Sequence, residues 1–84
     1  MAQVVLYGSG EPRGIAAELD EAVSRSGASV ELVSRDEAKI NDVTIITRIY
    51  EKYYMRNSSR ASLTVQLVSH AGRIRAFLAG TGGG

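Results

Sequence analysis

Three turn signals divide the last two thirds of this 84-residue chain into short segments rich in β-branched and aromatic residues. The signals are Asn41-Asp42, Asn57-Ser58-Ser59 and Ala71-Gly72, whose residue types favour the tight turns that join antiparallel strands. Between and before them, strands are predicted over residues 29–34, 38–40, 43–56, 60–70 and 73–78. This pattern predicts an antiparallel β-meander.

The first third of the chain predicts one strand and one helix. Residues 3–7 form a short β-rich run that is stopped by Gly8-Ser9-Gly10. Apolar residues then recur at helical spacing from Pro12 until Gly27, with acidic residues between them. We therefore expect a single small α+β domain over residues 1–84, in which one strand and one amphipathic helix precede the meander and the helix packs on one sheet face.

Composition narrows the classes of function. The chain has no cysteine and one histidine, His70, so a metal site or a nucleophilic triad is not expected. No apolar run is long enough to span a bilayer, and the N-terminus lacks a signal-peptide layout. We expect a cytoplasmic protein with no cofactor, no metal, no catalytic residue and no membrane contact, and a binding protein rather than an enzyme.

Charge is distributed unevenly along the chain. Residues 1–42 hold eight acidic and four basic side chains, whereas residues 43–84 hold one acidic and six basic ones. Such separation indicates an anionic partner or self-association of unlike faces.

The register of the meander predicts where the basic residues lie. If residues 57–59 form a three-residue loop, Tyr53 lies opposite Leu63 and Glu51 opposite Val65, which makes one mainly apolar face for the helix. Arg56 would lie opposite Arg60 on the other face, where a bound anion would relieve their repulsion. That face would carry Arg48, Tyr50, Lys52, Tyr54, Arg56, Arg60, Arg73, Arg75 and Phe77.

Two interpretations of this basic aromatic face stay open. Rings that alternate with cations suit nucleic acid, another polyanion or an anionic ligand, and they also suit self-association into a homo-oligomer. Alternatively, tyrosine, threonine and arginine are simply residues that a half-exposed strand favours. The leading hypothesis is a non-enzymatic binding or assembly module that uses this face.

The segment GSGEPRG supports an alternative hypothesis of a nucleotide-binding or catalytic domain. Glycines between a strand and a helix leave backbone N–H groups free for phosphate, and Arg13 could add a charge. The candidate residues of this loop are Gly8, Ser9, Gly10, Arg13 and Gly14. The glycine spacing is not that of a dinucleotide fold, and a tight turn that caps a helix is the favoured interpretation of the segment.

The run YEKYYMRN, continuing through RASL, resembles the central signature of a family of small bacterial proteins that is known only as a domain of unknown function. The resemblance extends to a helix before the signature and a GGG segment after it. It implies that a further strand and a closing helix follow the glycines, so that residues 1–84 lack part of the domain and oligomerise more readily. It implies no activity and no catalytic residue.

Overall fold

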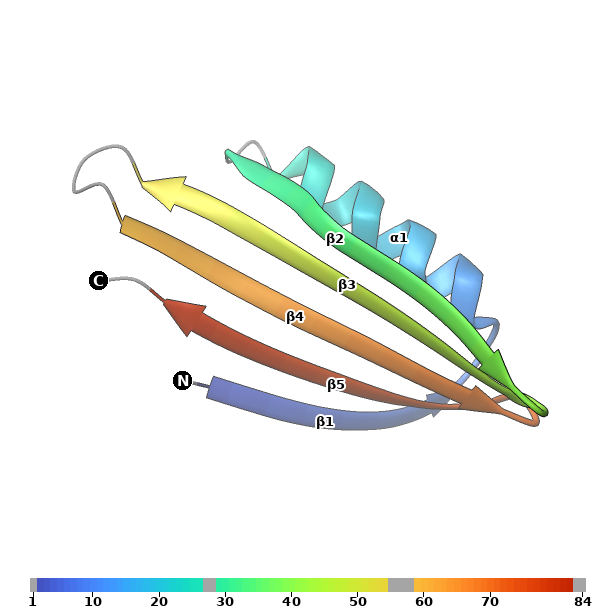
Figure 1. Cartoon of the computed structure of the whole chain (residues 1–84). Helices are drawn as coiled ribbons and strands as arrows, with labels where there is room; N and C mark the ends of the chain where they lie inside the picture. The colour runs from blue at the N-terminus through green and yellow to red at the C-terminus, as the bar shows by residue number, and fades with distance from the viewer. Residues whose placement is uncertain (1, 27–28, 55–58, 83–84) are drawn as a thin grey trace.

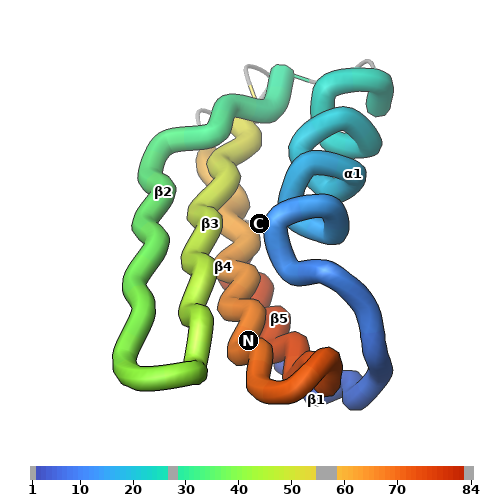
Figure 2. The backbone as a smooth tube through the Cα atoms, turned by 90° about the vertical axis from the view of Figure 1, so that its right-hand side faces the viewer, coloured from blue at the N-terminus to red at the C-terminus, as the bar shows by residue number. Residues whose placement is uncertain are grey.

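The computed structural model describes residues 2–26, 29–54 and 59–82. Its elements are β1 (Ala2–Ser9), α1 (Pro12–Arg25), β2 (Val30–Ile40), β3 (Val43–Tyr54), β4 (Ser59–His70) and β5 (Arg73–Gly82). The strands form one antiparallel five-stranded sheet in the order β1-β5-β4-β3-β2, and α1 lies along one face of it (Figures 1 and 2). The predicted α+β class and the helix on one sheet face are confirmed.

The start of α1 follows from local chemistry. Pro12 occupies the first turn, where its fixed φ suits the helix and its missing N–H costs nothing. The Glu11 carboxylate accepts hydrogen bonds from the backbone N–H groups of Arg13 (3.1 Å) and Gly14 (2.6 Å). These bonds satisfy two of the helix's unpaired donors and place a negative charge at its positive end.

The two turns with two central residues form as predicted. Ile40 pairs with Val43 around Asn41-Asp42, and His70 pairs with Arg73 around Ala71-Gly72. The second turn places Ile74, Ala76 and Leu78 opposite Ser69, Leu67 and Val65, which confirms that register.

The predicted register between β3 and β4 is wrong. Tyr54 pairs with Ser59 and Tyr53 pairs with Arg60, whereas the prediction placed Tyr53 opposite Leu63. Residues 57 and 58 of the predicted loop lie outside the described residues. Because strand side chains alternate between faces, this shift of three positions turns every β3 side chain over relative to β4. Tyr50 therefore lies opposite Leu63, and Ile46 lies opposite Leu67.

Two predicted pieces between residues 29 and 40 are one strand, β2, with a β-bulge between Leu32 and Ser34. The extra residue reverses the alternation along β2. Leu32 consequently pairs with Tyr50, on the helix side, whereas Ile40 lies on the other face and is 61% exposed.

The core lies between α1 and the sheet. Its buried apolar residues are Ala16, Ile46, Tyr50, Val65, Leu67 and Ile74. Helix α1 packs mainly against β2, β3 and β4, so β1 and β5 lie beside it rather than under it (Figure 2).

Candidate functional site

The structure divides the predicted basic aromatic face between the two sides of the sheet. Strand pairing places four of its members on the side of α1 and four on the opposite side, because the β3 register differs from the prediction. The first group is Arg48, Tyr50, Lys52 and Tyr54, and the second is Arg60, Arg73, Arg75 and Phe77. Arg56, and with it the expected pairing of Arg56 with Arg60, lies outside the described residues; Arg60 pairs with Tyr53.

Two members of the first group attach the helix to the sheet. The Tyr50 hydroxyl donates to Asp20 Oδ1 at 2.5 Å, and Arg48 Nε donates to the same carboxylate at 3.3 Å. Tyr50 is 2% exposed, and burial together with its bond to Asp20 raises the pKa of its hydroxyl far above the ordinary value. These side chains are therefore engaged inside the protein rather than presented to a partner.

We call the sheet face opposite α1 the open face, because in the described parts of the chain no helix covers it (Figures 1 and 2). Its centre carries no charge, because Thr47, Thr64 and Gln66 alternate there with apolar residues, most of which are half-buried. Pairing across the strands places these side chains on it: Val5, Ile45, Ile49, Val68 and Phe77.

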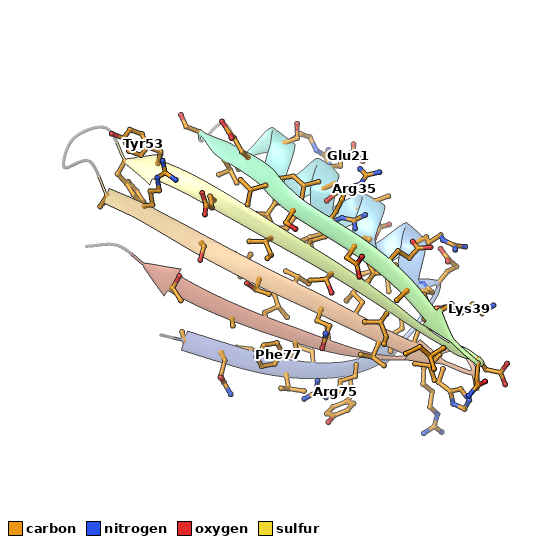
Figure 3. The ribbon with its side chains drawn as sticks, viewed as in Figure 1. Glu21, Arg35, Lys39, Tyr53, Arg75 and Phe77 are labelled. Carbon is orange, nitrogen blue, oxygen red and sulfur yellow. The ribbon has the colours of Figure 1, made fainter. Side chains whose placement is uncertain are left out.

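A basic corner lies where β5 begins. Arg73 pairs with Ser9 on one side and His70 on the other, and Arg75 lies between Tyr7 and Val68. The Arg75 guanidinium is 5.9 Å from the centroid of the Phe77 ring, and both side chains lie on the β1–β5 side of the face (Figure 3). Within the described ranges, neither Arg73 nor Arg75 forms a salt bridge.

An acidic corner lies diagonally opposite, where β2 begins and β3 ends. Glu31 pairs directly with Glu51, and like charges in this position destabilise a sheet. Arg60 Nη1 lies 3.5 Å from Glu51 Oε1, and Tyr53 marks this end of the face (Figure 3). A hollow of about 420 Å³ lies here, and it is lined by Ser29, Glu31, Glu51, Lys52, Tyr53 and Arg60. Sequence reasoning missed the Glu31–Glu51 pair because the β2 bulge determines it.

The groups of the GSGEPRG segment have partners within the chain. Gly8 and Ser9 belong to β1, and the Gly10 N–H donates to the carbonyl of Gly72 at 3.1 Å. The helix N–H groups bind Glu11, as described above. Arg13 Nη2 lies 2.6 Å from Glu37 Oε2, and this contact lowers the pKa of the Glu37 carboxyl. A phosphate would have to displace Glu11, so the geometry favours a capped turn.

A cavity of about 450 Å³ lies between the end of α1 and the sheet. Apolar side chains, among them Val23, Val30 and Leu63, form most of its lining, and Lys52 lies beside them. The Lys52 ammonium is 4.9 Å from the centroid of the Tyr54 ring. This space suits a small apolar group and offers no catalytic constellation.

Across residues 2–26, 29–54 and 59–82, no group of three or more His, Cys, Asp or Glu side chains could hold a metal ion. In the same ranges, no helix is long and apolar enough to cross a membrane.

A family model described as a family of unknown function, DUF6054, matches residues 1–84. The chain belongs to this family. DUF6054 brings no assigned activity, which agrees with the predicted resemblance to an uncharacterised family. The bacterial source and the specific tyrosine-rich signature stay predictions. No match to a curated protein was found.

Proposed function

We propose that this DUF6054 chain is a non-enzymatic assembly module whose open face packs against the open face of a second copy. One observation carries the proposal. A basic corner, Arg73 and Arg75, which has no salt bridge within the described residues, and a like-charge acidic pair, Glu31 and Glu51, lie at diagonal ends of an uncharged, partly apolar surface. Such a surface is complementary to itself.

A two-fold axis that lies in the plane of the interface, across this diagonal, exchanges the two corners. Each acidic pair then receives arginines from the other copy, and the uncharged centres meet. The same contact relieves the repulsion between Glu31 and Glu51, which Arg60 alone offsets only at 3.5 Å from one of them.

The size of the face is sufficient for a stable dimer. Five strands spaced about 4.8 Å apart and about 33 Å long cover roughly 800 Å². This estimate equals the area that each partner contributes to an interface of standard size, about 1,600 Å² in total. Two sheets packed in this way form a sandwich about 10 Å thick between their backbones.

The charge balance favours a second copy over nucleic acid or another polyanion. The open face carries Arg60, Arg73 and Arg75, but also Glu31, Asp36 and Glu51. Three acids therefore oppose three arginines, and a polyanion that lies along the face would meet as much repulsion as attraction.

Charge reversal tests the proposal. One variant carries Arg73→Glu and Arg75→Glu, and the other carries Glu31→Arg and Glu51→Arg. We expect sedimentation equilibrium to show at least tenfold weaker association for each variant alone, and recovery in an equimolar mixture, where opposite corners meet again. Because the variants share every other surface, the difference between mixture and separate samples reports on the open face.

The matched control is Arg35→Glu with Lys39→Glu, which reverses two exposed charges on the α1 side of β2. It should leave association unchanged. The proposal is wrong if mixing restores nothing or if the control weakens association equally. Salt-dependent binding of a labelled single-stranded oligonucleotide, lost in Arg73→Glu with Arg75→Glu, would support the polyanion hypothesis instead.

A further inference from the structure

Strand β1 is an unprotected edge of the sheet. All eight of its residues are exposed, and Val4, Leu6 and Tyr7 are 51%, 57% and 77% exposed. It contains neither a charged residue nor proline, and it pairs with β5 without a register shift. In the described structure no strand lies on its outer side (Figure 1). An edge strand without charge, proline or bulge is a template for another strand.

The other edge of the sheet carries the features that prevent such pairing. Strand β2 contains a bulge after Leu32, which disturbs the alternation of its hydrogen-bonding groups. It also carries five charged side chains along its length, and charged edges resist edge-to-edge contact. They are Glu31, Arg35, Asp36, Glu37 and Lys39.

We propose that β1 pairs antiparallel with β1 of a second copy, so that two sheets join into one of ten strands. The two-fold axis is perpendicular to the sheet and passes near Val5. Val4 then faces Leu6 of the second copy, and Gln3 faces its Tyr7. This register opposes apolar or neutral side chains on both faces and brings no like charges together, because β1 has none.

Pairing of the two β1 strands also extends the apolar surface on the α1 side of the sheet. Leu6 there lies beside Ile15 of α1, Ile74 and Ala76 around a hollow of about 170 Å³. In the pair, the apolar surfaces of the two copies become continuous between the two helices. On average, each opposed pair of residues in the new strand pair adds about one inter-strand hydrogen bond, in addition to this apolar contact.

Cysteine cross-linking tests the pairing, since the chain has no cysteine of its own. Residues directly opposed in antiparallel strands have Cα atoms about 4.5–5.5 Å apart, within the range of a disulfide. Val5→Cys should therefore cross-link at least tenfold faster than Ser34→Cys, an exposed position on the β2 edge. Both are measured in the Arg73→Glu, Arg75→Glu background, so that pairing of open faces does not contribute.

Leu6→Lys places a charge on the β1 edge and should slow the Val5→Cys cross-link at least tenfold, whereas Leu32→Lys on β2 should not. Equal rates at Val5→Cys and Ser34→Cys, or no effect of Leu6→Lys, would overturn the proposal. If circular dichroism shows that the variants misfold, amide hydrogen exchange of the wild-type chain provides a second test. In the wild-type chain, outward β1 amides should exchange at least tenfold more slowly at high than at low protein concentration, and equal exchange overturns it.

Discussion

Replacing Tyr50 by phenylalanine removes one hydroxyl from the contact between α1 and β3 and leaves the ring in the core. The hydroxyl donates to the Asp20 carboxylate at 2.5 Å, and the side chain is 2% exposed. A hydrogen bond to a charged acceptor contributes about 1.5–3 kcal/mol. Asp20 keeps its contact with Arg48 at 3.3 Å and is not left without a partner. The expected loss therefore lies at the lower end of that range, at about 1.5–2 kcal/mol.

This loss is large enough to measure in a domain of 84 residues. One kcal/mol shifts Tm by about 4–8 °C at this size, so Tyr50→Phe should lower Tm by roughly 6–16 °C. Urea denaturation followed by circular dichroism gives the free energy directly. Tyr54→Phe is the matched control: Tyr54 is on the same strand but 39% exposed, and the change should cost less than about 0.5 kcal/mol.

Alkaline pH provides a second readout of the same contact. The pKa of Tyr50 is raised in the folded protein, so its contribution to stability is complete below its ordinary pKa of about 10. Above pH 10 the unfolded chain loses this proton while the folded chain keeps it, and stability falls. Tyr50→Phe should abolish this part of the alkaline loss. If Tyr50→Phe lowers the free energy of unfolding no more than Tyr54→Phe does, and leaves its dependence on alkaline pH unchanged, the Tyr50–Asp20 contact does not stabilise the packing of α1 on the sheet.

Two further predictions concern the start of α1. The contact with Arg13 lowers the pKa of Glu37, so its stabilising effect is present above the ordinary glutamate pKa of about 4.5 and is lost as pH falls through the lower folded value. Unfolding curves of Glu37→Gln and wild type should therefore differ at neutral pH and converge once the pH falls below that folded value. Glu11→Ala removes the helix cap and should cost about 0.5–2 kcal/mol in urea denaturation, whereas Glu18→Ala, an exposed control within α1, should cost less.

The register of β4 and β5 could be predicted because two independent signals agree. Ala71-Gly72 allows a turn with two central residues, and both residues adopt the positive φ that such a turn requires. The apolar alternation on β5 then matches that on β4, with Leu67 opposite Ala76. A register shift of one residue would place the apolar residues of β4 and those of β5 on opposite faces, so the pattern allows a single register.

Alternation could not determine which face of β3 is buried. Ile45 and Ile49 look more like core residues than Arg48 and Tyr50, because they carry no polar atoms. Arg48 and Tyr50 nevertheless lie under the helix, where Asp20 satisfies their polar groups. A sequence does not reveal that partner, which lies on another element, 28 and 30 residues earlier in the chain. The predicted loop at residues 57–59 gave no independent check, since its length was inferred from the same pattern.

The charge asymmetry between the halves of the chain acquires a different meaning in three dimensions. Arg48 of the basic half is bound by Asp20 of the acidic half, which removes much of the attraction that a polyanion would feel. The arginines left unpaired on the open face, Arg73 and Arg75, lie diagonally across it from the opposed Glu31 and Glu51. A polyanion that reached the first corner would be repelled at the second, whereas an identical face turned about a two-fold axis satisfies both. The charge difference between the halves of the sequence is therefore more consistent with the proposed contact between copies than with a uniformly charged ligand.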